Sequence, residues 1–325
     1  MRSHTQPLVT VLTPVYNGEK YLTECIESVL AQTYANWEYY ILNNRSTDRT
    51  LKIAESYAAK DARVRVVTTE RFLPIMENHN TAFRLMSKDS KYCKMVHAPD
   101  WLFPECVEKM VDLAEAHPSV GIVGAYSLKD HTVICNGLPY PSPVTNGKEL
   151  GRKTFLGGPS VFGTPTTVLF AADVVRSRPQ FYNEASFHAD SEACFDVLRD
   201  RDFGFVHQVL TYSRVFPENA SRFDEVCLLF PEIETLFKYG RDYLSPEEFS
   251  RETGRLWDRY YTSLGSRVFR NRAKGFWQYH RTNLKRIGHS LRVERIAKAV
   301  IVKCFDIALN PLNTSLRITR KLVSF

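Results

Sequence analysis

Two hydrophobic periods alternate along the chain up to residue 221. Short apolar or β-branched runs predict strands, at residues 8–12, 37–42, 64–68, 92–96, 120–125, 166–170 and 204–210. Apolar residues spaced three and four apart predict helices, at residues 19–32, 49–59, 78–86, 102–116 and 191–200. Because strands alternate with helices, we expect mostly parallel strands joined by right-handed crossovers, which is a doubly wound α/β sheet with helices on both faces.

Residues 139–163 interrupt this regularity. They contain four prolines and five glycines, which are too many breakers for a regular element. We therefore expect a long surface segment of the kind that often forms a lid or a binding loop.

From residue 222 onward the hydrophobic period is helical. The predicted helices lie at residues 228–239, 245–268, 275–288 and 291–309. The last of them is basic and amphipathic, and Pro311 ends it. We therefore predict two regions, an α/β domain at residues 1–221 and a helical, basic C-terminal region at residues 222–325.

Composition restricts the class of protein. The chain has 325 residues and 44% hydrophobic content, enough to bury a sizeable core. Its seven cysteines are odd in number and include no C-x-x-C pair, so they indicate neither a disulfide framework nor a zinc site and favour a reducing compartment. No run approaches the roughly 20 apolar residues that a bilayer span requires. We expect a cytoplasmic protein without a membrane crossing.

The net charge of +7 is unevenly distributed. Residues 266–325 carry 14 Lys and Arg residues against 2 Asp and Glu, which leaves the preceding residues with a net charge of −5. A basic tail suits an anionic membrane surface or nucleic acid, and the alternative is a solvated helical face. Nucleic acid is disfavoured because no recognised binding module is present.

Peripheral attachment to the cytoplasmic face of a membrane is our expectation for this tail, since apolar positions accompany its charges. These positions are Ile296, Ala299, Val300, Val302, Phe305 and Leu309. The same residues would alternatively pack on the α/β domain or form a homodimer contact.

Candidate chemistry gathers at the end of the run 92–96. The apolar run stops at His97, Ala98, Pro99 and Asp100, which predicts a buried strand that delivers an imidazole and a carboxylate to the sheet edge. Such an edge is where α/β proteins bind ligands. The alternative is a turn at Pro99, with Asp100 capping the following helix.

The first loop does not have the glycines of a dehydrogenase. A G-x-G-x-x-G turn is needed there for backbone to approach a pyrophosphate, and this chain has Thr13-Pro14-Val15-Tyr16-Asn17-Gly18 instead. Such a loop is suited to placing side chains against a flat group such as a nucleobase. Asn43, which ends the second predicted strand, can offer an amide donor and acceptor to a base edge, or it can form an Asx turn.

Taken together, four segments resemble the GT-A-fold, family 2 inverting glycosyltransferases. They lie in order at residues 8–18, 28–33, 43–48 and 96–104, within a resemblance that covers roughly residues 7–220. The resemblance implies a GT-A sheet and an enzyme that moves a sugar from a nucleotide-sugar donor, a UDP-sugar in the first instance, to a hydroxyl of a glycan or lipid-linked acceptor.

For the donor, the resemblance implies a nucleotide pocket lined by side chains of the first loop and of later strand ends. The residues are Thr13, Pro14, Tyr16, Asn17, Asn43, His97 and Arg214. Asn43 stands where the family usually has an aspartate bonded to uracil. Arg214 would approach the diphosphate, and Phe216 stands where the family has a histidine.

A divalent metal, Mg²⁺ or Mn²⁺, is implied at Asp100, which matches the last aspartate of the D-x-D-type motif. His97 fits the variant that begins with histidine, and Pro99 replaces a carboxylate. One carboxylate with phosphate oxygens and water can hold such a metal, although more weakly than two carboxylates.

Inversion requires a general base opposite the leaving group, and the resemblance implies Asp190, with Glu192 second. The alternative for Asp190 is a helix cap. The loop Gly157-Gly158-Pro159-Ser160 would lie beside the acceptor, although turn chemistry alone would also explain it.

A second hypothesis follows from the departures at Asn43, Pro99 and Phe216, which all fall on the donor side. In that case the chain is a GT-A-shaped protein that binds nucleotide or glycan without turnover.

Overall fold

The computed structural model describes residues 6–159, 161–186, 188–214, 225–268 and 274–309. These divide into two compact units. One contains the described residues up to Arg214 together with Asp242–Leu244, and the other contains the remaining helical residues. The predicted boundary at residue 221 lies outside the described residues.

A single ten-stranded sheet forms the first unit, with the order β3-β2-β1-β4-β9-β6-β10-β5 and with β7 on β6 and β8 on β10. The strands are β1 Val9–Val15, β2 Trp37–Asn43, β3 Val64–Thr68, β4 Tyr92–Met95, β5 Trp101–Leu102, β6 Val120–Lys129, β7 Thr132–Ile134, β8 Val144–Thr145, β9 Val168–Ala171 and β10 Asp202–Ser213. The strands β1 to β4 pair in parallel, as do β6 and β10, whereas β9 runs antiparallel between β4 and β6.

The parallel register brings the candidate residues to one edge. Val15 at the end of β1 lies opposite Asn43 at the end of β2, and Leu12 lies opposite Met95 at the end of β4. The first loop, Asn43 and the turn at His97 therefore all leave the sheet at the carboxyl ends of neighbouring strands. The mostly parallel α/β sheet expected from the sequence is confirmed.

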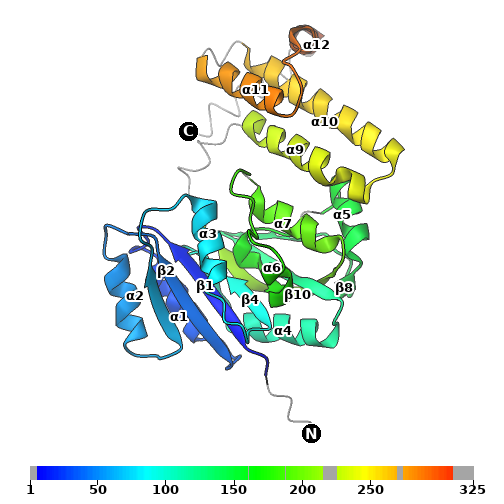
Figure 1. The fold of residues 1–325 in the computed structure, drawn as a ribbon. Helices are drawn as coiled ribbons and strands as arrows, with labels where there is room; N and C mark the ends of the chain where they lie inside the picture. The colour runs from blue at the N-terminus through cyan, green and yellow to red at the C-terminus, as the bar shows by residue number, and fades with distance from the viewer. Residues whose placement is uncertain (1–5, 160, 187, 215–224, 269–273, 310–325) are drawn as a thin grey trace. The chain divides into compact units, whose positions relative to one another are not determined.

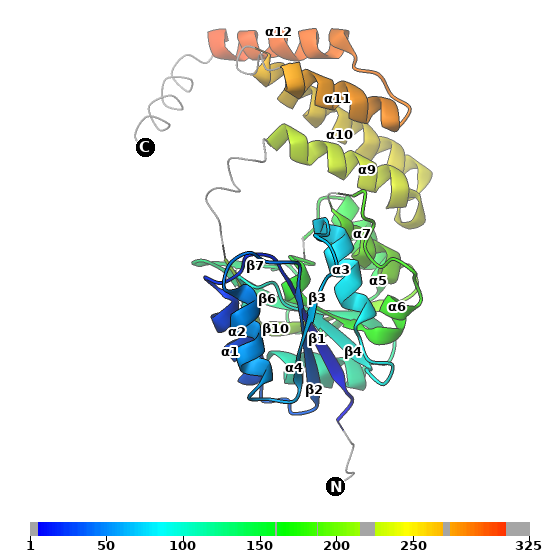
Figure 2. The ribbon, with the colours of Figure 1, turned by 60° about the vertical axis from the view of Figure 1, so that its left-hand side comes forward.

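Helices cover both faces of this sheet. They are α1 Leu22–Leu30, α2 Thr50–Ala58, α3 Ile75–Arg84, α4 Cys106–Ala116, α5 Gly147–Phe155, α6 Ala172–Arg176 and α7 Ala189–Leu198, with a 3₁₀ turn, η1, at Pro165–Thr167. Figure 1 shows these elements in chain order by colour. Figure 2 shows α1 and α2 on one side of the strands and α3 and α6 on the other.

Each face has its own core. On one face, apolar side chains of α1, α2 and α4 pack with strand residues such as Val11 and Ile41, which are fully buried. On the other face, aromatic rings join α3 to β9, with Phe83 and Phe170 each 5.0 Å from Phe181 between ring centroids. This second core fixes α3 against the sheet, close to the turn at His97.

Two predictions in this unit are wrong. The helix predicted from residue 102 begins at Cys106, because Trp101 and Leu102 pair with β10 as β5, and Trp101 stacks on Tyr212 at 3.7 Å. Residues 139–163, predicted to lack regular structure, contain β8 and α5, whose first turn is capped by the Asn146 side chain. The hydrophobic pattern could not reveal either feature, because a cross-strand pair and a helix cap leave the spacing of apolar residues along the chain unchanged.

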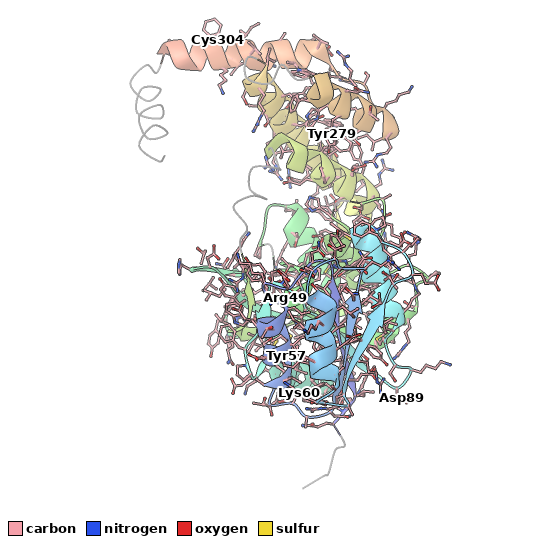
Figure 3. The ribbon with its side chains drawn as sticks, turned by 90° about the vertical axis from the view of Figure 1, so that its left-hand side faces the viewer. Arg49, Tyr57, Lys60, Asp89, Tyr279 and Cys304 are labelled. Carbon is pink, nitrogen blue, oxygen red and sulfur yellow. The ribbon has the colours of Figure 1, made fainter. Side chains whose placement is uncertain are left out.

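The second unit is helical, as expected. Its helices are α9 Glu225–Tyr243, α10 Pro246–Arg267, α11 Lys274–Arg286 and α12 Val293–Leu309. A capping box between Ser245 and Glu248 begins α10. The Tyr279 side chain on α11 and the Cys304 side chain on α12 are exposed (Figure 3). Within the described part of the chain, no helix combines the length and the apolar character needed to span a bilayer.

Candidate functional site

Asp100 lies in the turn that follows β4, and its carboxylate is almost completely buried. Its Oδ2 accepts a hydrogen bond of 2.7 Å from the Thr166 hydroxyl, and its Oδ1 accepts one of 3.1 Å from the Arg214 backbone N–H. Burial raises the pKa of Asp100 to about 6, and these hydrogen bonds offset part of the effect. Asp100 makes no cap contact with α4, whose N-cap is Glu105, so the capping alternative is wrong.

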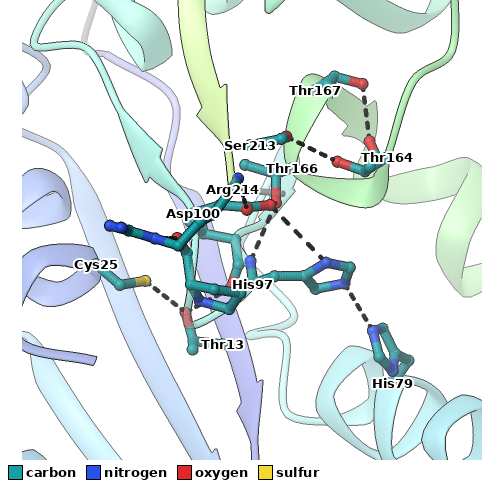
Figure 4. Close-up of polar contacts among 12 residues, drawn as sticks. Thr13, Cys25, His79, His97, Asp100, Thr164, Thr166, Thr167, Ser213 and Arg214 are labelled. Atoms are coloured by element: carbon teal, nitrogen blue, oxygen red, sulfur yellow. Dashed lines mark hydrogen bonds and ion pairs between the residues drawn. The ribbon is translucent and has the colours of Figure 1, made fainter. Parts of the chain in front are cut away.

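His97 lies three residues before Asp100 and belongs to the same network (Figure 4). Its Nδ1 is 4.0 Å from Asp100 Oδ2, and its Nε2 is 2.9 Å from Nε2 of His79 on α3. The backbone N–H of His97 donates to the Thr166 hydroxyl oxygen at 3.1 Å. Burial lowers the pKa of His97 and lowers the pKa of His79 to about 3, so both rings are neutral at pH 7.

Thr166 is held in turn by a buried lysine. Lys94 of β4 is fully buried, and its ammonium donates to the carbonyl oxygens of Thr166 and Val168, the latter at 3.0 Å. Burial without a carboxylate contact lowers the pKa of Lys94. Lys94 therefore fixes the backbone of η1, and through Thr166 it orients the turn that carries Asp100.

The Arg214 guanidinium lies beside this turn. Its Nε donates to the Pro99 carbonyl at 3.3 Å, and its Nη2 pairs with Glu24 at 2.6 Å. The guanidinium also lies 4.5 Å from the centre of the Tyr21 ring, a cation–π distance. A permanent positive charge is thus present next to Asp100. Phe216, the other predicted departure in this segment, lies outside the described residues.

The first loop presents some of its predicted side chains and buries others. Thr13 is fully buried, and its hydroxyl donates to the Val96 carbonyl at 2.8 Å. Pro14 lies within β1. Tyr16 is 48% exposed and meets the 54% exposed Phe72 ring edge-on, with 4.8 Å between ring centroids. Tyr16 of this exposed aromatic pair follows the end of β1, and the sequence analysis did not identify Phe72.

Asn17 and Asn43 shape the loops around that pair. Asn17 has a positive φ of 50°, and its Oδ1 accepts from the Thr47 backbone N–H at 2.8 Å. Asn43 is buried, its Oδ1 accepts from the Ser46 N–H at 3.1 Å, and its Nδ2 donates to the Thr68 hydroxyl at 3.2 Å. Asn43 therefore bonds the backbone three residues on, one residue beyond an Asx turn, and the neighbouring strand β3, and a contact with a base stays a prediction.

Asp190 is at the start of α7, where its Oδ1 accepts from the Ser191 backbone N–H at 2.7 Å. Burial raises its pKa above the ordinary carboxyl value. Glu192 is buried, and its two oxygens accept from the Ser186 hydroxyl at 2.6 Å and the Asn183 amide at 3.2 Å. Glu192 is thus bound to its own loop, which makes Asp190 the more available of the two carboxylates.

The segment around η1 connects the two carboxylates. Thr166 bonds to Asp100, while Gly163, Thr164 and Pro165 line, together with Asp190, a hollow too narrow for a water molecule. The Tyr182 ring lines the same hollow and lies 6.0 Å from the His79 ring, between centroids. The Tyr182 hydroxyl is buried without a hydrogen-bond partner among the described residues. Both predicted carboxylates therefore border one short segment.

The predicted acceptor loop begins where α5 ends. Gly157 has a φ of 85°, and the Gly158 N–H donates to the Lys153 carbonyl at 2.8 Å, which is the hydrogen bond of a Schellman helix end. Helix termination therefore accounts for both glycines. Pro159 follows them, and Ser160 lies outside the described residues. An acceptor contact at this loop stays a prediction.

A family model described as glycosyl transferase family 2 matches residues 10–175. The chain belongs to this family. Related family 2 segments occur in a Haemophilus influenzae protein described as an uncharacterized glycosyltransferase, 32% identical over 37% of this chain, and in the Escherichia coli chondroitin synthase, 32% identical over 42% of it. The aligned segments span only 36% and 20% of those two proteins. The family resemblance expected from the sequence is confirmed.

Two solved structures share the fold. The Staphylococcus aureus TarS structure of residues 1–349 in complex with UDP superposes with a TM-score of 0.61 at 16% identity, covering 85% of this chain and 78% of that one. The Pyrobaculum calidifontis mannosyltransferase PcManGT, in complex with GDP-Man and Mn²⁺, gives a TM-score of 0.56 at 14% identity and covers 97% and 84%. The GT-A fold class expected for this family 2 chain is confirmed.

Family 2 membership raises the question of a metal. The part of the chain that the structure describes contains no group of three or more His, Cys, Asp and Glu side chains placed to hold one. His97 and Asp100 supply two donor atoms, an imidazole nitrogen and a carboxylate oxygen that also accepts from the Thr166 hydroxyl. This pair fits Mg²⁺ or Mn²⁺ that takes its other ligands from phosphate and water.

Besides Phe72, the sequence analysis missed three residues of the network around Asp100 in this family 2 site, namely His79, Lys94 and Thr166. Lys94 alone had a visible signal, since it is a charged residue inside an apolar run of strand type. Thr166 was assigned to a strand, and His79 to an ordinary helix. Their roles depend on contacts between segments that are between 18 and 72 residues apart in the chain.

Proposed function

We propose that this protein is an inverting glycosyltransferase that moves a sugar from a nucleoside diphosphate donor, a UDP-sugar, to a hydroxyl of a glycan or lipid-linked acceptor. The observation that carries the proposal is that two carboxylates with raised pKa values, the buried Asp100 and the partly buried Asp190, both border the segment 163–167. Perturbed carboxyl groups at a strand-end site are typical of catalytic groups.

On the donor side, the residues around Asp100 bind and orient the diphosphate. His97 and Asp100 would hold Mg²⁺ or Mn²⁺, which supplies positive charge to the departing diphosphate when it is bound. Arg214 adds a second positive charge at the same turn. The exposed rings of Tyr16 and Phe72 give the nucleobase an apolar surface on which to stack.

On the acceptor side, Asp190 takes the proton from the attacking hydroxyl. A base works best when its pKa lies near the operating pH, and burial moves the pKa of Asp190 in that direction. Tyr182 lines the same hollow, and its buried hydroxyl has no hydrogen-bond partner among the described residues. Attack from this side, opposite the diphosphate, gives inversion at the anomeric carbon.

The choice of donor and acceptor draws on similar proteins. TarS structures contain UDP and UDP-GlcNAc, and PcManGT contains GDP-Man with Mn²⁺. These complexes support a nucleoside diphosphate donor and a divalent metal. The similarity to a chondroitin synthase supports a growing glycan as acceptor, and hence a place in polysaccharide biosynthesis.

A binding protein without turnover is the second candidate. It is favoured by the Asn43 amide, whose donor and acceptor are engaged within the protein, and by Pro99 in place of a carboxylate. Such a protein would bind UDP and release none from a UDP-sugar.

Release of UDP from a panel of UDP-sugars in the presence of Mn²⁺ tests the proposal. We expect Asp190→Asn to lower kcat by about 10² to 10⁴, the usual contribution of a general base. Asp196→Asn is the matched control, since Asp196 lies on the same helix and pairs with Arg199. We expect it to stay within about twofold of wild type, because this ion pair is partly exposed and lies outside the residues that line the hollow.

Two outcomes contradict the proposal. UDP binding without UDP release from any sugar would favour the binding protein, and equal loss of activity in both aspartate variants would remove the specific role of Asp190. The anomeric configuration of the product, read by NMR, tests inversion.

We further propose that α12 attaches the protein to an anionic membrane surface. Four large apolar side chains on one side of this helix, Ile301, Val302, Phe305 and Leu309, are between 55% and 77% exposed. Lys298 lies on the same side one turn earlier, by the 3.6-residue period. An apolar stripe with basic neighbours is complementary to anionic headgroups over an acyl interior.

A further inference from the structure

His79 is a buried histidine on the inner side of α3. The helix is fixed there by the aromatic core of Phe83 and by Asn80, whose amide exchanges two hydrogen bonds of 2.8 Å with the backbone of Tyr182. The imidazole of His79 therefore has a fixed position. Among the described residues it has two polar contacts, the Ile75 carbonyl and the His97 ring.

These two contacts determine the tautomer of each ring. The Ile75 carbonyl can only accept, so His79 Nδ1, which is 2.6 Å away, carries the proton. The Nε2 of a neutral His79 is then an acceptor. Since His97 Nε2 lies 2.9 Å from it, His97 must donate from Nε2, and its Nδ1 carries a lone pair.

That lone pair is on the ring nitrogen that faces Asp100. His97 Nδ1 is 4.0 Å from Asp100 Oδ2, too far for a shared proton. Two electron-rich atoms therefore face each other at a buried site with no proton between them. The opposite tautomer of His97 would direct an N–H at Asp100 and leave no nitrogen ligand.

We propose that His79 is a positioning residue that locks His97 in the Nε2–H tautomer and so keeps His97 Nδ1 available as the nitrogen ligand beside Asp100. The inference rests on the proposed function, since it concerns the divalent metal of the donor complex. Metal-binding histidines usually donate their other ring N–H to a fixed acceptor, and here that acceptor is a second histidine oriented by a peptide carbonyl.

Two variants separate this role from packing. His79→Gln places an amide oxygen near the position of His79 Nε2 and keeps an acceptor for His97. His79→Met fills a similar volume and has no comparable acceptor. We expect His79→Met to weaken Mn²⁺ binding in the presence of UDP by about 10- to 100-fold, the usual effect of losing such a partner, and His79→Gln to restore most of it.

The readouts do not require turnover. Mn²⁺ affinity is measured by electron paramagnetic resonance of the free ion, with thermal melting of each variant as the check on folding. The tautomer is read directly from the ¹⁵N shifts of His97 in metal-free, ¹⁵N-histidine-labelled protein, with His97→Asn identifying the resonances. We expect a protonated Nε2 and a bare Nδ1 in the wild type, and a mixture of tautomers in His79→Met.

A proton on Nδ1 of wild-type His97 would overturn the inference, as would a folded His79→Met variant with Mn²⁺ affinity within twofold of wild type. If His79→Met does not fold, the wild-type tautomer and the affinity of His79→Gln decide the question. A wild type that binds no Mn²⁺ also overturns the inference. UDP release in the presence of a chelator then tests the glycosyltransferase proposal separately.

Discussion

Single residues in this site combine burial with unusual charge states. Asp100, Lys94 and His79 are all buried, and burial shifts each pKa toward the neutral form. A folded protein tolerates such groups where their hydrogen bonds are satisfied, as they are here by Thr166, Arg214 and two backbone carbonyls. Folding the site therefore costs free energy, because ionisable groups are removed from water. The Asp100 carboxylate is placed there to receive a cationic ligand.

Replacing Asp100 with asparagine tests this cost. The pKa of Asp100 is raised from 3.8 to about 6, so the folded state binds the proton more tightly than the unfolded state does. The corresponding stabilisation is complete below about pH 4 and is lost as the pH rises through 6. Asp100→Asn stays neutral, and we expect it to raise the free energy of unfolding above pH 7 by up to about 3 kcal/mol while UDP release falls.

Denaturant titrations of both proteins between pH 4 and 8, in the presence of a chelator, measure this effect. The difference between them should vanish near pH 4. A constant difference across that range would show that Asp100 does not titrate as described.

At the scale of elements, two glycines of α10 differ in how closely other atoms approach them. Gly265 of α10 faces α12, and a Cβ added there would lie 2.6 Å from the Ala299 Cβ and 3.2 Å from backbone. Gly254 is in the same helix, and a Cβ there would meet no atom within 4 Å. Only the first glycine is therefore required by packing.

Alanine at these two positions should have opposite effects. We expect Gly254→Ala to stabilise the helical unit by about 0.5–1 kcal/mol, because alanine loses less backbone entropy than glycine in a helix interior. We expect Gly265→Ala to destabilise it by about 1–3 kcal/mol, because α12 must move away from α10. Hydrogen exchange of the α12 amides and thermal melting measure both, and a stabilised Gly265→Ala would contradict the described contact.

At the scale of the whole molecule, charge is concentrated at one end of the chain. Residues 266–325 carry 14 basic against 2 acidic side chains, and α12 adds exposed apolar residues to them. Electrostatic attraction and apolar insertion strengthen each other at an anionic bilayer. The two contributions can be measured separately, because salt screens the electrostatic attraction and does not screen the apolar insertion.

Flotation of the full chain with vesicles of neutral and anionic lipid tests membrane attachment. We expect binding to anionic vesicles that weakens with salt and falls at least about tenfold in Phe305→Glu, because a charge replaces a side chain that inserts into the acyl region. Val293→Glu is the control, since Val293 is 68% exposed on another side of α12. Equal partitioning of Phe305→Glu and wild type would exclude this face, and a monomer–dimer shift in Phe305→Glu would indicate a homodimer contact instead.

The sequence by itself determined the order of strands and helices, the family and the positions of Asp100 and Asp190, because hydrophobic period and short motifs are local properties of the chain. It did not reveal α5, β5 or the hydrogen-bond network of the site. Those depend on an added cap, a cross-strand pair, and contacts such as His79 with His97 and Lys94 with Thr166. Tertiary structure alone decided them, because burial and hydrogen bonding between distant segments set the tautomer and the charge of each group.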